Sequence, residues 1–250
     1  MEQAESIVLG SGFFAAGFAL SHPGTRVFEA QQLADAAFSP SMEGYGAPRP
    51  DALSEAGAAL ADKMTKAGFF GEVSDDIAKC ELILSSFCRE EKTSVLFSTV
   101  LTGVEAAPGG YRVSLFAVDG EREYLTRRVI DARVSTAGDR YRVVLDGVSK
   151  PLDPWDFVGG TCSCFGGLPG GRAVLTFAFD RNVTPAEARL CAVRSLSEHL
   201  PEGARILHMA LICGLSRYPA PTVGEDGIVR VDERAFAHPL AAFESGVNFQ

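Results

Sequence analysis

The apolar residues at the start of the chain fall into two short blocks separated by glycines. Residues 7–9 form a fully apolar run, which is typical of a buried parallel strand, and the sequence Gly10-Ser11-Gly12 ends it. Residues 13–20 are rich in alanine and aromatic residues, so we expect a helix that can lie close to a sheet. A second short strand is predicted at 26–29. The pattern predicts a compact β-α-β unit.

The next part of the chain combines helical spacing with strand alternation. Apolar positions recur at three- and four-residue steps over 52–67 and 75–91, which predicts two helices after a loop at 31–50. Ser74 is placed to cap the second helix. Asp119-Gly120 is a strong hairpin signal between alternating runs. The strands predicted here are 95–100, 104–107, 111–118 and 123–132, the last three forming a meander.

Beyond about residue 140 the pattern changes to fewer, shorter apolar runs. Thr184-Pro185-Ala186-Glu187 is a capping box with proline at the first helical position, so we expect a helix through about His199. The glycine-dense stretch 159–167 is predicted to be a turn, and the tail from Pro219 is predicted to be rich in loops. Strands are predicted at 141–145, 173–179 and 206–215.

Composition narrows the class of protein. The 250 residues are 46% hydrophobic and carry a net charge of −9, which gives a nucleic-acid partner no electrostatic support. No positive residue precedes the first apolar stretch, so an export signal is not expected, and no run reaches membrane-spanning length. We expect a soluble, cytoplasmic protein. The cysteines show no CxxC pair and suggest reduced thiols: Cys80, Cys88, Cys162, Cys164, Cys191 and Cys213.

The glycine turn is the strongest candidate for chemistry. A strand that delivers Gly-x-Gly into a helix N-terminus creates an anion site, because backbone N–H groups and the helix dipole face a phosphate that the glycines allow to approach. Gly10 and Gly12 supply the first two glycines and Ala15 takes the third position. Glu29 lies 19 residues after Gly10 and can accept hydrogen bonds from ribose hydroxyls. The unit predicts a dinucleotide site.

Other candidates for chemistry are weaker. Cys162-Ser163-Cys164 is poorly spaced for a redox disulfide or a metal site, so we interpret it as small side chains packed in a turn. The four histidines lack metal-ligand spacing, and His199 near a helix C-terminus favours a structural role. Trp155 is interpreted as an anchor at the edge of the core. No Gly-x-Ser-x-Gly elbow or P-loop occurs, and no catalytic acid or base and no metal ligand is assigned.

The stretch "SIVLGSGFFAAGFAL…TRVFEA" resembles the N-terminal unit of FAD-dependent oxidoreductases with a glutathione-reductase-like flavin domain. "LILSSFCREEKTSVLFSTVLTGVE" is similar to the family's helix and third strand, and "RRVIDA" to the end of its crossover. The resemblance implies FAD as cofactor, with backbone at Val100 near the adenine. The cofactor-binding residues that it implies are Gly10, Ser11, Gly12, Phe13, Phe14, Ala15, Glu29, Ala30, Val100 and Ala132.

With the resemblance, the predicted fold is α/β. Residues 1–135 are expected to form an FAD/NAD(P)-binding Rossmann-like domain with a β-meander crossover, and residues 136–250 a smaller α+β domain that serves the substrate. The resemblance implies an FAD-dependent oxidoreductase acting on an unidentified small molecule. A degenerate, inactive relative that serves as a binding or partner subunit is the alternative, and an NAD-binding protein is a third reading.

The chain also departs from the family pattern. Ala132-Arg133-Val134 replaces the usual Ala-Thr-Gly step, and the glycine pair expected after Glu29 is missing. The family's C-terminal flavin-binding strand and helix, with their glycine-rich motif, have no recognised counterpart. The sequence therefore supports the adenosine half of an FAD site better than the flavin-ring half. We expect that either a homo-oligomer or a partner chain would complete the flavin site.

Overall fold

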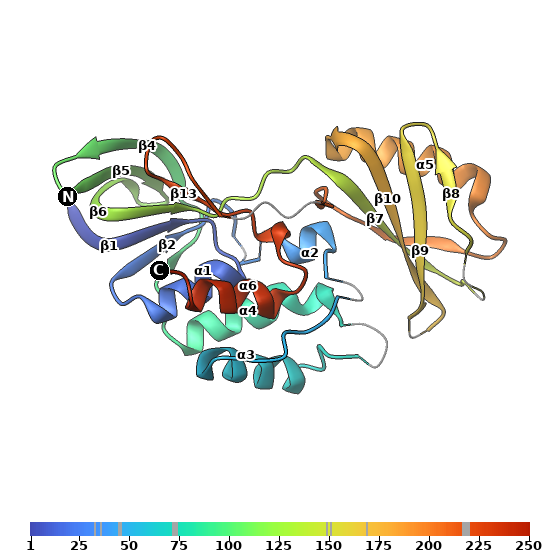
Figure 1. Cartoon of the computed structure of the whole chain (residues 1–250), viewed down its shortest axis with the longest axis horizontal. Coiled ribbons are helices and arrows are strands. Elements are labelled where there is room, and N and C mark those ends of the chain that lie inside the picture. Colours follow the sequence, from blue (N-terminus) through green and yellow to red (C-terminus); the bar gives the residue numbers. More distant parts are fainter. Residues whose placement is uncertain are drawn as a thin grey trace.

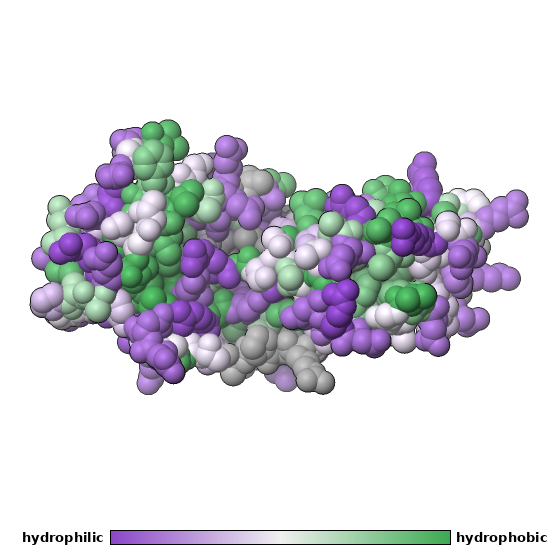
Figure 2. Space-filling view, turned by 90° about the horizontal axis from the view of Figure 1, so that it is seen from above, coloured by the Kyte–Doolittle hydropathy of each residue, from purple (hydrophilic) through white to green (hydrophobic). Residues whose placement is uncertain are grey.

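The structure is a computed structural model, and it describes residues 1–32, 34–35, 37–44, 47–71, 75–148, 150, 152–168, 170–216 and 221–250. It has two lobes, each built on one β-sheet (Figure 1). Polar side chains are spread over both lobes, with apolar residues among them (Figure 2). The predicted cap Ser74 lies outside the described residues.

The first lobe contains a sheet with a parallel centre and an antiparallel meander. The path of paired strands is β12-β13-β6-β1-β2-β3, and β5 pairs with both β4 and β6. β1 is parallel to both β2 and β6, as the predicted β-α-β unit requires. The strands are β1 (Glu2–Leu9), β2 (Thr25–Phe28), β3 (Val95–Leu96), β4 (Val100–Ala107), β5 (Gly110–Ala117), β6 (Gly120–Asp131), β12 (Thr222–Val223) and β13 (Val229–Arg230).

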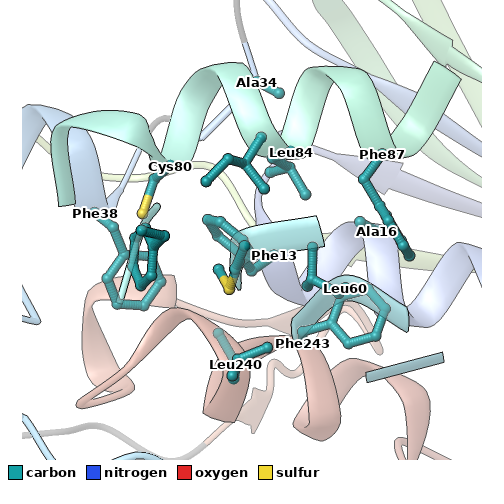
Figure 3. Packing of buried hydrophobic residues seen from close by; sticks show 14 of the residues in the cluster. Phe13, Ala16, Ala34, Phe38, Leu60, Cys80, Leu84, Phe87, Leu240 and Phe243 are labelled. Atoms are coloured by element: carbon teal, nitrogen blue, oxygen red, sulfur yellow. The ribbon is translucent and has the colours of Figure 1, made fainter. Parts of the chain in front are cut away.

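Helices cover one face of this sheet (Figure 1). Phe13, Leu60, Leu84 and Phe243 come from four different helices and meet in one buried cluster (Figure 3). Ser54 caps the third helix by accepting a hydrogen bond from the Gly57 N–H at 3.0 Å. The helices are α1 (Phe13–Ser21), α2 (Phe38–Ser41), α3 (Glu55–Lys66), η1 (Ile77–Lys79), α4 (Cys80–Glu90), η2 (Glu233–Ala235) and α6 (Pro239–Val247).

Two glycines let the first and last helices touch backbone to backbone. A Cβ on Gly17 of α1 would lie 2.2 Å from the carbonyl oxygen of Phe243 in α6. A Cβ on Gly246 of α6 would lie 2.1 Å from the carbonyl oxygen of Phe14 in α1. Real Cβ atoms do not approach this closely, so larger residues here would force the helices apart. This contact fixes the C-terminal helix beside the glycine turn that begins α1.

The second lobe is an antiparallel sheet with one helix. The strand order is β11-β7-β10-β9-β8, and α5 (Pro185–His199) packs against β7 and β10. The capping box of Thr184 and Glu187 is present, which confirms the predicted helix. The stretch predicted as a glycine-rich turn is instead strand, because β9 pairs along β10 through Cys162 and Cys164. The strands are β7 (Gly138–Asp146), β8 (Trp155–Phe157), β9 (Gly160–Leu168), β10 (Arg172–Val183) and β11 (Arg205–Met209).

The structure differs from the sequence predictions chiefly in the C-terminal part of the chain. The segment from Thr222 onward is not a loop-rich tail: β13 pairs in parallel with β6 of the first sheet, and α6 packs on α1. A C-terminal strand and helix beside the glycine turn are therefore present, although without a glycine-rich motif. Leu240 and Phe243, which belong to the predicted second domain of residues 136–250, are buried in the core of the first lobe. The loop predicted at 31–50 contains the short helix α2.

Buried polar bonds tie the two lobes together. Arg142 of β7 forms a 2.7 Å ion pair with Glu43, and both side chains are almost completely buried. Arg234 of the first lobe is 1% exposed and donates to the carbonyl oxygens of Ala137 (2.8 Å) and Cys213 (2.6 Å). A buried charge without a partner costs free energy, so separating the lobes would leave these charged groups without their partners. The bonds therefore hold the lobes in one orientation.

Candidate functional site

Gly10 is required by the backbone of the predicted cradle, the turn at residues 10–12 that leads into α1. Its φ of +100° lies in the region that favours glycine. Its N–H donates to the carbonyl oxygen of Phe28 at 2.8 Å, which joins the turn to the end of β2. A Cβ on Gly10 would lie 2.7 Å from the carbonyl oxygen of Ala132 at the end of β6. The ends of three parallel strands therefore meet at this glycine.

Glu29 lies where the sequence predicts it, directly after β2 and beside the turn, and it is buried. Its Oε2 accepts hydrogen bonds from the Ser11 N–H (2.7 Å) and the Ser11 hydroxyl (3.1 Å). Its Oε1 accepts from the Gln31 N–H at 2.9 Å. Both carboxylate oxygens are thus engaged within the chain, and Glu29 positions the glycine turn in this structure.

The other predicted residues separate into buried and exposed ones. Phe13 packs edge-on against Phe38 in the helical core, with ring centres 5.7 Å apart (Figure 3), and Phe14 stacks on Phe236 at 6.3 Å. Val100 is 52% exposed at the start of β4. The structure brings together one set of predicted residues at the strand ends: Gly10, Ser11, Gly12, Glu29 and Ala132. Ala15 faces the sheet, and Ala30 is exposed beside Glu29.

An acid that the sequence analysis did not select occupies the centre of this cradle. The Glu233 side chain, from the turn between β13 and α6, lies against Gly12, and a Cβ there would be 1.9 Å from its Oε2. Its Oε1 accepts a hydrogen bond from the Ala15 N–H at 3.3 Å. Glu233 is 1% exposed, and its Oε2 has no hydrogen-bond partner among the described residues.

Burial dominates the electrostatics of this acid. It raises the pKa of Glu233 to about 8, and the nearby carboxyl of Asp35 acts in the same direction. The N–H groups at the start of α1 lower that pKa, but by less than burial raises it. Burial also raises the pKa of Asp35 to about 6. The Asp35 carboxyl accepts hydrogen bonds from the N–H groups of Phe38 (2.9 Å) and Ser39 (2.8 Å) at the start of α2.

The backbone of the cradle fits an FAD-type dinucleotide, but its interior does not. In such sites the second glycine leaves room for a diphosphate to approach the turn and the helix N-terminus. Here the room beside Gly12 is filled by the carboxyl group of Glu233. A diphosphate and this side chain would occupy the same space, so the cradle as described does not accept FAD.

Sequence spacing gives little warning of Glu233. It begins the one-turn helix η2, and its partner Ala15 lies 218 positions earlier in the sequence. Asp35 lies two residues before Ala37, which holds the N-cap position of α2, so the usual cap spacing does not select it. The sequence pattern also did not predict the short helix α2.

A separate pocket of about 400 Å³ lies between the lobes. Its wall in the second lobe comes from strands of the sheet, and its wall in the first lobe from the region around η1. Asp75 on the first wall is held by Arg49 (2.6 Å) and by buried His238 (2.9 Å). The lining is Ser39, Met42, Gly68, Phe69, Gly71, Asp75, Asp76, Ile77, Ala78, Val144, Leu168, Arg172, Leu207 and His208.

The remaining candidates have structural surroundings. Trp155 donates to the Ser195 hydroxyl at 2.7 Å and stacks on His199, with ring centres 4.9 Å apart, which agrees with an anchor at the edge of the core. Burial raises the pKa of Cys162 to about 12, so its thiol is unreactive. Within the described ranges, no three His, Cys, Asp or Glu residues are grouped to hold a metal ion.

Comparison with known proteins identifies the fold. No family model and no curated protein matches the chain. The halogenase CndH, described as a variant of FAD-dependent halogenases, is 16% identical, with a TM-score of 0.60 over 99% of this chain and 71% of its own. A flavoprotein/dehydrogenase from Cytophaga hutchinsonii is 13% identical, with a TM-score of 0.57 over 98% of this chain and 76% of its own.

Two further solved structures agree with these. The p-nitrophenol 4-monooxygenase PnpA from Pseudomonas putida is 10% identical, with a TM-score of 0.56, and 77% of it is covered. BexE, whose structure is described as giving insights into oxidation during BE-7585A biosynthesis, is 15% identical to this chain, with a TM-score of 0.57. The chain spans 61% of the length of BexE. In the described part of the chain, helices are too short or too polar to cross a membrane. The chain shares the mixed α/β fold of these solved structures, with a Rossmann-like lobe and a second β lobe.

Proposed function

We propose that this protein is a small-molecule-binding relative of FAD-dependent oxidoreductases that works without resident FAD. The observation that carries the proposal is the Glu233 carboxyl group against Gly12, which takes the space a diphosphate needs. This favours the reading of a degenerate relative over that of a working flavoenzyme. We place its origin near hydroxylases, monooxygenases and FAD-dependent halogenases, because solved structures with these descriptions match at least 91% of the chain.

The pocket between the lobes is the site we assign to the ligand. It forms from residues of both lobes, in the size range of small-molecule sites, and does not use the cradle. Apolar side chains such as Phe69, Ile77 and Val144 supply most of its walls, while Asp76 and Arg172 bring opposite charges to its two sides. These features favour an apolar or aromatic molecule with at least one polar group.

FAD-linked redox chemistry is the second candidate. The specific observation in its favour is the intact set of Gly10, the start of α1, and Glu29 at the end of β2. For FAD to bind, the Glu233 side chain would have to leave the cradle. When bound, FAD would supply the redox chemistry, and this chain would supply binding and orientation.

Cofactor content separates these two functions. We would purify the unmodified protein and measure its absorbance across the flavin bands and its small-molecule content by mass spectrometry. The proposal expects no flavin in native preparations and none taken up from added FAD. A stoichiometric amount of FAD in the purified protein would contradict the proposal and establish the second candidate.

Ligand binding at the interlobe pocket needs its own measurement. The probe is 1-anilinonaphthalene-8-sulfonate, an aromatic anion whose fluorescence rises in apolar surroundings. We expect saturable binding near one site per chain, because the pocket is apolar and has room for a ligand of this size. Unsaturable or absent binding would argue against a preformed ligand site.

A further inference from the structure

The first turn of α1 is arranged around a group that is not part of the helix. The N–H groups of Phe13, Phe14 and Ala15 all act on the Glu233 carboxyl, and Ala15 N lies 3.3 Å from its Oε1. Unpaired N–H groups at a helix N-terminus favour an anionic or acceptor partner. Glu233 takes the position that an external anion would otherwise hold.

Gly12 indicates that this space is not needed by the fold. Its φ of −135° and ψ of −164° are extended backbone that any residue adopts, so its conformation does not require glycine. What it lacks is a side chain, and the missing Cβ would lie 1.9 to 2.4 Å from three atoms of Glu233. The glycine thus provides a space, and that space contains a carboxyl group.

The second indication is that one carboxyl oxygen of Glu233 lacks a hydrogen-bond partner where it lies. Its Oε2 is buried and has no hydrogen-bond partner among the described residues. A buried polar atom without a partner costs free energy, so the side chain is not optimised as a structural element. An oxygen-rich ligand could use the N–H groups at this turn in its place.

We infer that the Glu233 side chain closes a latent nucleoside-diphosphate site, acting as an internal substitute for the diphosphate. Beyond Cβ, the side chain has four heavy atoms against the five of a phosphate group, so shortening it frees most of the space that a phosphate needs beside the α1 N-terminus. Ser11 and Glu29 lie next to this room, with Glu29 placed at the strand end to meet a ribose.

The closure acts by shape more than by charge. Burial raises the pKa of Glu233 to about 8, so the group is mostly protonated at neutral pH. A side chain of the same size without a charge would still fill the space beside Gly12. This distinguishes two variants: Glu233→Gln keeps the size of the side chain, whereas Glu233→Ala removes most of it. The amide should therefore leave the site closed and the alanine should open it.

The experiment is calorimetric titration of ADP into the full chain at neutral pH, with melting curves to confirm that each variant is folded. We expect Glu233→Ala to bind ADP at least about tenfold more tightly than either the unmodified protein or Glu233→Gln. In the Glu233→Ala background, Gly12→Val should abolish the gained binding, because its side chain refills the cradle. A melting curve of that double variant shows whether the loss of ADP binding comes from a refilled cradle or from an unfolded protein.

Three outcomes would overturn the inference. They are equal ADP affinity in the unmodified protein and Glu233→Ala, no ADP binding by folded Glu233→Ala, and gained binding that survives folded Gly12→Val. Each would mean that Glu233 does not close a nucleotide site at this turn. The inference rests on the proposed function but concerns the cradle and not the interlobe pocket. If the inference fails while the purified protein contains no flavin, the proposed ligand-binding function is unaffected.

Discussion

The cradle and the interlobe pocket differ in the space that each leaves for a ligand. The cradle has the glycine turn, the helix N-terminus and the strand-end acid of a dinucleotide site, but Glu233 fills it. The pocket has about 400 Å³ of space, but its lining contains no motif that the sequence analysis recognised. The cradle has the sequence motif but no free space for a ligand, whereas the pocket has free space but no recognised motif.

The difference teaches that a motif describes the path of the backbone, whereas binding depends on the space that remains. Gly10 keeps the strand-turn-helix path because its φ of +100° and the nearby Ala132 carbonyl require glycine. That requirement persists whether or not a nucleotide binds. A single acid from a distant part of the chain, Glu233, is then sufficient to fill the space that a nucleotide would need.

The largest expected effect comes from breaking the contact that holds the pocket together. Glu43→Ala leaves Arg142 buried without its carboxylate partner, so we expect a loss of about 3–5 kcal/mol in the free energy of unfolding. Urea denaturation measures it. Glu123→Ala, at an exposed position on β6, is the control and should change stability by less than about 0.5 kcal/mol. Equal small losses in both variants would show that the interlobe ion pair does not stabilise the fold.

The two cradle glycines should differ in their structural cost. Gly10→Ala places a side chain at positive φ against backbone atoms, so we expect it to lower stability by about 2–4 kcal/mol. Gly12→Ala meets only the end of the Glu233 side chain, and we expect a cost of about 1–2 kcal/mol. Denaturation of both variants, and of Gly12→Ala combined with Glu233→Ala, tests this comparison. If Gly12→Ala costs the same with and without Glu233, the two residues are not coupled.

The closed cradle should also have a pH signature. The pKa of Glu233 is higher in the folded chain, about 8, than its ordinary value of 4.5. Its contribution to stability is therefore fully present below pH 4.5 and is lost as pH rises toward 8, by up to about 1.4 kcal/mol per pH unit. Glu233→Gln removes this dependence, so its melting temperature should fall less than that of the unmodified protein between pH 6.5 and 8.

Asp35, whose carboxyl acts electrostatically on Glu233, is the group that complicates this measurement. Burial raises its pKa to about 6 from 3.8, so its own loss of stability occurs mainly between pH 4 and 6. The comparison above pH 6.5 therefore reports chiefly on Glu233. Parallel pH profiles for the two proteins across that window would contradict the assignment.

The smallest expected effect tests the pocket. Ala78→Trp adds a large side chain to the lining, and we expect it to weaken binding of 1-anilinonaphthalene-8-sulfonate by about tenfold, or 1.4 kcal/mol. Ala59→Trp, on the exposed side of α3, is the matched control and should leave the affinity unchanged. Fluorescence titration of both variants measures the difference. An equal effect of the two tryptophans would place the probe elsewhere on the molecule.

Much of the first lobe could be predicted because its signals are local. The apolar run before Gly10, the alanine-rich helix and the second strand appear where their spacing indicates. The local signal of the capping box at Thr184 is confirmed in the same way in the second lobe. The errors fall where pairing between distant segments decides. The glycine-rich stretch around Cys162 becomes a strand because β10 supplies its hydrogen bonds.

The sequence by itself therefore determined the β-α-β unit, the glycine turn and the position of Glu29, because each depends on residues within about thirty positions. Only the tertiary structure decided that α6 returns to pack on α1 and that Glu233 enters the cradle from 218 residues beyond Ala15. The physical reason is that the glycines at 17 and 246 let two helices approach at backbone distance. No local pattern in the chain encodes which distant carboxyl group that approach brings to Gly12.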